Sequence, residues 1–233
     1  MKEYLARYLN ELQIDYSQEQ MEQFEAYHRL LAQWNEKINL TAIREPQEVA
    51  LKHFADCLYG MPYLPEGARL IDVGSGAGFP GVPLKIMRPD LEVLLLDSLN
   101  KRVLFLEELI QSLGLSNICT IHSRAEDGAK GKLRESFDVA TARAVANLSV
   151  LSEYCLPYVK VGGCFLAYKG SAGFEEIAEA KNAVKILGAK VEKQEEYILP
   201  DSDIRHTLAV IRKTKNTPSE YPRNAGKISK KPL

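Results

Sequence analysis

A glycine-rich loop that directly follows a short apolar strand is the feature that most constrains the fold. Residues 69–73 are apolar enough for a buried strand, and Gly74, Gly76 and Gly78 follow within five residues. Glycine lets the backbone turn tightly and approach a ligand without a Cβ atom in the way. In a parallel sheet, the first strand-to-helix turn is the usual place of a nucleotide. The loop therefore predicts an α/β domain with a ligand site at its first turn.

Short apolar runs and helical segments alternate along the rest of the chain. Segments long enough for crossover helices, such as 99–113 and 147–158, separate the first five runs, which predicts a mostly parallel sheet with helices on both faces. Only residues 200–204 separate the last two runs, so we expect them to pair as an antiparallel hairpin at one edge. The predicted fold is a doubly wound sheet with seven strands, at 69–73, 92–96, 118–122, 137–141, 163–169, 191–199 and 205–212.

The first 66 residues have the pattern of a helical lobe. Ser17 and Gln20 predict a capping box at the start of one helix, and a second helix is expected at about 45–60. Apolar side chains recur every three or four positions of the first helix, at Met21, Phe24, Tyr27, Leu31, Trp34 and Ile38. Proline and glycine at 62–67 then mark a boundary. We expect a helical lobe at 1–66, a ligand-binding domain at 67–215 and a tail at 216–233.

Basic residues are concentrated at the C-terminal end, although the whole chain has a net charge of −1. Residues 212–233 contain seven basic residues and one acidic residue, a net charge of +6, while the rest of the chain carries −7. Such an end could hold the phosphates of a nucleic acid, and the alternative is a solvated tail that aids solubility. From charge alone the two interpretations have equal weight.

Cysteine spacing and hydropathy exclude other classes. The four cysteines stand far apart, with no histidine at a zinc-like spacing beside them, so we expect neither a metal site nor a disulfide framework. No run approaches the eighteen or so apolar residues of a membrane span, and the N-terminus lacks the apolar core of a signal peptide. We therefore expect a cytoplasmic protein that does not enter a membrane.

The loop argues against a dinucleotide and against a phosphate-binding P-loop. The dinucleotide fingerprint needs glycine where this chain has Phe79, and the Gly-Lys-Ser/Thr ending of a P-loop is absent. The carboxylate of Asp72, at the start of the loop, would repel a pyrophosphate and attract an amine. S-adenosylmethionine has an ammonium group and a cationic sulfonium, so it is the ligand we expect at Asp72 and the glycines.

Acidic residues at the next two strand ends fit the same ligand. Asp97 ends the second strand about 23 residues after Gly74, where it can accept hydrogen bonds from ribose hydroxyls. After the third strand, Arg124, Ala125 and Glu126 offer a backbone amide and a carboxylate that could read an adenine edge. Acidic residues at three successive strand ends, together with the glycine loop, favour S-adenosylmethionine more strongly than any one of these acidic residues would alone.

Several longer strings point to a family. They are Trp34–Thr41, His53–Asp56, Asp72–Pro83, Leu96–Arg102, Ser123–Glu126, Thr141–Ala144, Tyr168–Gly170 and Tyr221–Arg223. From about Trp34 to its C-terminus the chain resembles the glucose-inhibited division protein B family. These bacterial enzymes use S-adenosylmethionine to methylate guanine N7 in small-subunit (16S) ribosomal RNA. The resemblance implies a Rossmann-like class I methyltransferase fold with S-adenosylmethionine as cofactor.

The resemblance also implies particular site residues. Those that line the cofactor site are Gly74, Phe79, Ala125, Glu126 and Arg143, with Asp97 and Ser98 on the ribose side. The chain departs from the family pattern at Cys57, where serine is common, and at Ile228, where proline is usual. We expect the change at Ile228 to loosen the tail.

Arg143, just past the fourth strand, is the expected catalytic residue. Its planar fork could hydrogen-bond guanine O6 beside N7, or the carboxylate of the cofactor, and so fix the approach of the two reactants. The alternative is an ion pair with Asp138 or Asp72. Because N7 has a free lone pair and loses no proton on attack, no general base is needed, and we expect His53 to be a hydrogen-bonded structural residue.

The expected partner is small-subunit ribosomal RNA or the assembling small subunit, bound by a monomer. Candidate RNA-binding residues are Asn39, Arg124, Lys169, Arg223, Lys227 and Lys230. The alternative for Asn39 is that it caps a helix end together with Asn35. The alternative for Lys169 is that its side chain is solvated and contacts no RNA. Two other functions stay open, a small-molecule methyltransferase and a non-catalytic ribosome-assembly factor. The basic tail favours RNA over a metabolite, and the intact loop argues against a non-catalytic protein.

Overall fold

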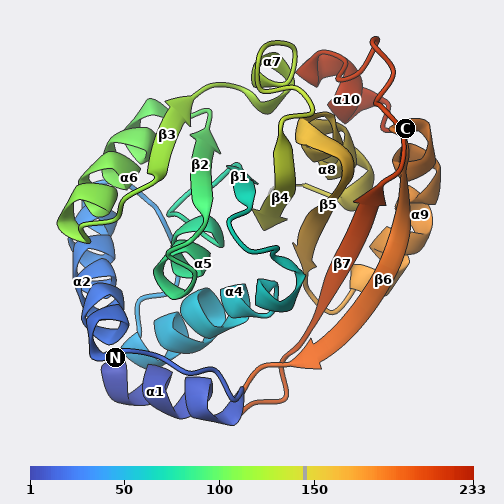
Figure 1. Ribbon diagram of the computed structural model, residues 1–233. Coiled ribbons are helices and arrows are strands. Elements are labelled where there is room, and N and C mark those ends of the chain that lie inside the picture. Colours follow the sequence, from blue (N-terminus) through green and yellow to red (C-terminus); the bar gives the residue numbers. More distant parts are fainter. Residues whose placement is uncertain (144–145) are drawn as a thin grey trace.

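Seven strands form one sheet in the order β3-β2-β1-β4-β5-β7-β6 in the computed structural model, which describes residues 1–143 and 146–233 (Figure 1). The strands are β1 (Arg69–Val73), β2 (Glu92–Asp97), β3 (Ile118–His122), β4 (Phe137–Arg143), β5 (Val159–Lys169), β6 (Ala189–Ile198) and β7 (Arg205–Lys213). Strands β1 to β5 pair in parallel, and β7 is antiparallel to both β5 and β6. The doubly wound sheet with an edge hairpin is confirmed. Ala144, the last residue of one family string, lies outside the described residues.

Helices cover both faces of the sheet because successive strand residues point to opposite sides. Leu70, Val139 and Leu166 belong to one apolar core, while their neighbours Ile71, Ala140 and Phe165 belong to the other. The first core is covered by α1 (Lys2–Glu11), α2 (Gln18–Asn35), α4 (Asp56–Leu58), α5 (Gly81–Met87) and α6 (Asn100–Ser112). The second is covered mainly by α8 (Leu148–Cys155) and α9 (Gly173–Ile186).

The helical lobe packs directly on the sheet and shares its first core. The predicted capping box is present, since Ser17 Oγ accepts from the Gln20 backbone and the Gln20 side chain accepts from the Ser17 backbone. The second predicted helix is irregular: a short helix α3 (Pro46–Glu48) leads into a π-helical segment, η1 (Val49–Ala55), and then into α4. π-Helical turns are rare and often lie at functional sites.

The direction of chain winding reverses between β1 and β4, which lie side by side. Ligands in doubly wound sheets bind beyond the carboxyl ends of the strands at such a switch point. The same edge of the sheet carries the ends of β1, β2, β3, β4 and β5. The topology therefore brings the glycine loop together with Asp97, Arg124, Arg143 and Lys169.

The C-terminal tail is folded against the second face rather than loose. Residue Lys213 at the end of β7 is buried and donates to Glu135 and to the carbonyl oxygens of Leu156 and Val159. A last helix, α10 (Ala225–Lys230), packs on α8. Ile228 in this helix is fully buried, so the expectation that this residue loosens the tail is wrong.

None of the helices in the described part of the chain is both long and apolar enough to cross a membrane. Within the same residues, no group of three or more His, Cys, Asp or Glu side chains is placed to hold a metal ion.

Candidate active site

The glycine loop has the backbone conformation that only glycine adopts easily. The φ angles of Gly74, Gly76 and Gly78 are 74°, 59° and 95°. A Cβ atom on Gly78 would also lie 2.6 Å from the Tyr27 hydroxyl, which donates a hydrogen bond to the carbonyl oxygen of Ala77. Helix α2 of the lobe therefore contacts the loop directly and holds its shape.

Asp72 lies near the end of β1, where the sequence predicts a contact with the ligand, but its carboxylate is hydrogen-bonded within the protein. It is fully buried. Its two carboxylate oxygens accept hydrogen bonds from the backbone of Gly81 at 3.1 Å and from the hydroxyl of Thr141 at 3.1 Å. Burial raises its pKa to about 6, against the effect of these hydrogen bonds. The carboxylate thus joins β1 to α5 and β4, and its influence on a ligand is through the shape of the loop.

Asp97 fixes the other side of the loop. Its buried carboxylate accepts from the backbone N–H of Gly76 at 2.9 Å and from that of Leu99 at 2.9 Å. The Nη1 atom of Arg102 lies 3.6 Å from Asp97 Oδ2. Each carboxylate oxygen can accept more than one hydrogen bond, so both keep capacity for ribose hydroxyls. The expected ribose contact stays a prediction.

A cavity of about 330 Å³ opens beside these residues at the ends of β1, β2 and β3. Its lining includes the expected Gly74, Ser98, Arg124, Ala125 and Glu126. Three observations make it fit S-adenosylmethionine: a loop with glycine at every second position, a buried carboxylate at the tip of β2, and a cavity at the switch point. The residues expected on the adenosine side are thus brought together. Gly76 and Gly78 shape the loop but do not line this cavity.

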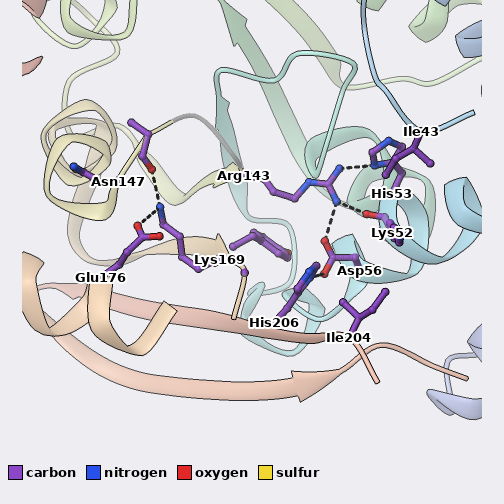
Figure 2. A pocket seen from close by; sticks show the side chains of 13 residues that line it. Ile43, Lys52, His53, Asp56, Arg143, Asn147, Lys169, Glu176, Ile204 and His206 are labelled. Carbon is purple, nitrogen blue, oxygen red and sulfur yellow. Dashed lines mark hydrogen bonds and ion pairs between the residues drawn. The ribbon is translucent and has the colours of Figure 1, made fainter. Parts of the chain in front are cut away.

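A larger cavity of about 790 Å³ lies beyond the ends of β4 and β5. Figure 2 shows Arg143, His53 and Asp56 grouped on one side of it and Lys169, Glu176 and Asn147 on the other. Its walls come from the helical lobe, from the sheet edge and from the start of β7. The cavity is large enough for a nucleobase with part of its sugar-phosphate, and both ends of it are polar.

Arg143 is held by the lobe. Its Nη1 donates to the carbonyl oxygen of Lys52 at 2.8 Å and to Asp56 Oδ2 at 2.9 Å, and its Nη2 donates to His53 Nδ1 at 3.2 Å (Figure 2). The guanidinium carbon also lies 4.9 Å from the centre of the Phe79 ring. The sequence suggested Asp138 or Asp72 as the ion-pair partner, and this was wrong: the partner is Asp56, 87 residues earlier.

His53 is a structural residue in this network, as expected from the sequence. Because its Nδ1 accepts from Arg143, its proton is on Nε2, which donates to Thr41 Oγ1 at 2.7 Å. The ring stacks on Phe79 with 4.5 Å between the ring centres. Burial, together with the positive charge of Arg143, lowers the pKa of His53 to about 3. The imidazole is therefore neutral at physiological pH.

Asp56 is the centre of the network and was missed as a functional residue. Its second oxygen, Oδ1, accepts from the Tyr197 hydroxyl at 2.7 Å and from His206 Nδ1 at 2.8 Å. Burial alone would raise the pKa of Asp56, but the hydrogen bond from His206 and the charge of Arg143 lower it. Tyr197 and His206 are on the edge hairpin, more than 140 residues further along the chain. Only the His-Phe-Ala-Asp string could have pointed to this site.

Two RNA-binding candidates make ion pairs within the protein. Lys169 donates to Glu176 at 2.7 Å and to the carbonyl oxygen of Ala146 at 2.7 Å. Arg223 donates to both oxygens of the buried Glu153. The other four candidates are exposed: Asn39 after α2, Arg124 before α7 (Ala125–Gly128), and Lys227 and Lys230 together on α10.

Asn35 has the capping role expected from the sequence. Its side chain accepts from the backbone of Leu40 and of Thr41 and donates to the Thr41 carbonyl. Asn39 lies beyond the end of α2 and does not share this role. It keeps its place among the RNA-binding candidates.

The chain is similar in sequence to known proteins over most of its length. Residues 20–204 match the family model described as "GidB: rRNA small subunit methyltransferase G". A protein of Clostridium beijerinckii named ribosomal RNA small subunit methyltransferase G is 56% identical over 220 residues, covering 93% of this chain and 92% of that protein. One of the same name from Alkaliphilus metalliredigens is 54% identical over 217 residues, covering 92% and 91%.

Solved structures with low sequence identity share the fold. A SAM-dependent methyltransferase from Aquifex aeolicus superposes with a TM-score of 0.54 at 20% identity, covering 77% of this chain and 97% of that one. TYW2 of M. jannaschii, solved in complex with AdoMet, gives a TM-score of 0.52 at 16% identity, covering 66% and 74%. At these identities the likeness concerns the sheet and its helices alone.

Proposed function

The chain belongs to the rRNA small subunit methyltransferase G family, and from this premise we propose that it transfers a methyl group from S-adenosylmethionine to N7 of a guanine in small-subunit (16S) ribosomal RNA. The enzyme acts in the cytoplasm, as a monomer, on small-subunit RNA or the assembling subunit. The observation that carries this proposal is the pair of cavities at one sheet edge. One has the features of an S-adenosylmethionine site, and the other, lined by Arg143, has room for a base.

The residues of the chain act by positioning. When bound, S-adenosylmethionine supplies an electrophilic methyl group, and the nucleophile must reach it in line with the sulfur. Three N–H donors of Arg143 contact the lobe, and two remain among the five of a guanidinium. These two can hold guanine O6 or the cofactor carboxylate. Fixed orientation of this kind supplies much of the rate gain in a bimolecular transfer.

No residue around Arg143 is needed as a general base. His53 is neutral, but its one acceptor nitrogen is used by Arg143 and its N–H by Thr41. Guanine N7 has no proton to lose, so the site has no use for a base. The arrangement therefore suits N7 better than an exocyclic amine or a ring carbon. A small-molecule methyltransferase and a non-catalytic assembly factor are less favoured, because the relatives are named as ribosomal RNA enzymes and the loop is intact.

Two measurements test the proposal. Mass spectrometry of small-subunit RNA from cells with and without this protein should show one N7-methylguanine that depends on it. Calorimetric titration of the purified chain should detect S-adenosylmethionine and S-adenosylhomocysteine but no tight NAD or ATP. Identical RNA from both strains would overturn the reaction. Tight NAD binding without a response to either sulfur ligand would overturn the cofactor.

A further inference from the structure

The C-terminal segment 217–233 reaches the smaller cavity. Ala225, the first residue of α10, lines this cavity together with Arg124, Ala125 and Tyr154. In Figure 1, α10 lies at the top of the view, beside α7 (Ala125–Gly128) and next to α8, on which it packs. A segment that is distant in sequence from the glycine loop thus forms part of the same wall.

An ion pair fixes this segment to α8. Arg223 Nε lies 2.9 Å from Glu153 Oε1 and Nη2 lies 2.6 Å from Oε2, the two-pronged geometry of a strong guanidinium–carboxylate pair. The backbone N–H of Arg223 donates to the same Oε1 at 2.8 Å. The side chain of Glu153 is only 1% exposed, so removal of Arg223 would leave a buried carboxylate without its ion-pair partner.

A second arginine, Arg134, holds the backbone of the same segment. Arg134 donates to the carbonyl oxygens of Tyr221 and Thr217, at 2.7 Å each, and to that of Pro218 at 3.1 Å. Backbone acceptors bound in this way cannot move without losing charge-assisted hydrogen bonds. The path of residues 217–223 is therefore fixed before α10 begins.

Helix α10 has a buried side and a basic side. Asn224 caps its start by accepting from the backbone of Lys227. Ala225 faces the cavity and Ile228, three residues later, is fully buried, while Lys227 and Lys230 are exposed. The apolar side of the helix is thus used to form the wall, and the lysines point outward.

We propose that segment 217–233 is a strap that forms the outer wall of the adenosine side of the cofactor pocket, and that the Arg223–Glu153 pair holds it in place. The inference rests on the proposed function, since it takes S-adenosylmethionine as the ligand of this cavity. A wall of this kind keeps water from the bound adenosine and completes its apolar contacts. Arg223 and Glu153 act through the strap and are positioning residues.

The strap can be tested with the full-length chain and S-adenosylhomocysteine. Arg223→Ala should raise its dissociation constant at least tenfold by calorimetry. Lys231→Ala, which removes an exposed cation of the same segment, should change it less than twofold. In methylation assays, Arg223→Ala should raise KM for S-adenosylmethionine while kcat at saturating cofactor changes less than threefold. A thermal melt checks that each variant is folded.

A second variant and a ligand-free measurement keep the proposal falsifiable. A chain ending at Asn224 keeps the Arg223–Glu153 pair but lacks Ala225 and Ile228, and it should also bind the ligand at least tenfold more weakly. Without any ligand, Arg223→Ala should speed amide hydrogen exchange in α7 and α10. Folded variants that bind like the unmodified chain would overturn the strap. Failure of the unmodified chain to bind either sulfur ligand would overturn the proposed function instead, and unchanged exchange in Arg223→Ala would then overturn the strap as well.

Discussion

Arg143 is a cation that the fold largely buries at the wall of a cavity and orients with three hydrogen bonds. Replacing it with alanine removes both the charge that balances Asp56 and the two N–H donors that remain for substrate or cofactor. We expect Arg143→Ala to lower the single-turnover methylation rate by a factor of 100 or more, since about 2.7 kcal/mol of lost orientation already has this effect. Breaking a buried pair also destabilises the fold, by about 3–5 kcal/mol.

A matched variant separates these two effects. Asp56→Asn leaves Arg143 charged and keeps an oxygen that can accept its hydrogen bond. The substitution removes the negative charge of the Asp56 carboxylate. We expect this variant to unfold at a lower temperature but to keep more activity than Arg143→Ala when both are assayed well below their melting temperatures. Near-normal turnover in folded Arg143→Ala would show that the catalytic role has been given to the wrong residue.

His53 should not act as a base at any physiological pH. Its pKa of about 3 keeps the ring neutral across the working range, and both ring nitrogens are occupied. We expect the single-turnover rate to be flat between about pH 5.5 and 8, with no rise near the ordinary histidine pKa of about 6.5. His53→Gln retains one acceptor and one donor, so it should keep activity within tenfold. A folded His53→Gln chain that binds RNA but is inactive would contradict the structural role.

Asp72 should make the fold less stable as the pH rises. Because its pKa is raised to about 6, the folded state holds its proton more tightly than the unfolded state, and the stabilisation is lost as the pH rises through about 6. A difference of about two pH units corresponds to about 3 kcal/mol. The lowered pKa of His53 acts in the opposite direction over the same range, so the effect of Asp72 is measured as a difference between two chains. In urea unfolding from pH 4.5 to 8, the unmodified chain should lose about 2 kcal/mol of stability relative to Asp72→Asn.

An exposed carboxylate provides the control for Asp72. Hydrogen bonds from Arg88 lower the pKa of Asp90, so its charge does not change in this pH range. Asp90→Asn should therefore keep the slope of the unmodified chain. Parallel curves for Asp72→Asn and the unmodified chain would show that the buried carboxylate is not the source of the slope.

At the scale of elements, the contact between α2 and the glycine loop links the helical lobe to cofactor binding. Tyr27→Phe removes the hydroxyl that donates to Ala77 and leaves a buried carbonyl without its partner, which costs about 1–3 kcal/mol. We expect a lower melting temperature and weaker S-adenosylhomocysteine binding. Tyr8→Phe is the matched control, because the buried Tyr8 hydroxyl has no hydrogen-bond partner among the described residues. Equal effects of the two substitutions would disprove a specific role of Tyr27.

Elements governed by local pattern could be predicted from the sequence, and their long-range partners could not. The capping box at Ser17 and the end of β3 at His122 follow from spacing and apolar runs, and β2 ends at Asp97, one residue later than predicted. The π-helical turn of η1 was not foreseen, since residues 45–60 read as an ordinary helix. That turn lies between Glu48 and Asp56 and carries Lys52 and His53, so it shapes the part of the lobe that binds Arg143.

For the whole molecule, the sheet order determines which distant residues meet. The order places β4 beside β1 and the edge hairpin beside β5, so Asp56 of the lobe meets Arg143 and His206. No spacing within one sequence encodes such a pairing. The partners of Asp72 are also distant in sequence, since its carboxylate accepts from Gly81 and from Thr141 of β4. The sequence shows that a carboxylate lies near a strand end, but it does not show which groups that carboxylate contacts. The expectation for the tail was also wrong, because α10, the helix that carries the buried Ile228, packs on α8, which lies far earlier in the chain.

The two sides of α10 allow RNA affinity to be separated from cofactor affinity. Lys227, Lys230 and Lys231 are exposed, in or directly after the helix whose Ala225 lines the cofactor cavity, and we expect them to contact RNA phosphates. Each phosphate contact contributes about 0.7–0.9 to the slope of log K against log salt. Changing all three lysines to glutamine should therefore lower that slope by about two, while S-adenosylhomocysteine affinity stays within twofold because the buried side of the helix is kept.

The measurement is the affinity for small-subunit RNA across about 50 to 300 mM KCl, with S-adenosylhomocysteine at saturation. Lys181, Lys185 and Lys190, which are exposed on α9 and at the start of β6, provide a matched triple change to glutamine with the same loss of net charge. If RNA affinity depended only on the net charge of the protein, both triple variants would lower the slope of log K against log salt equally. We expect a larger change for the α10 lysines, because Ala225 of the same helix lines the cofactor cavity, beside which the guanine must react.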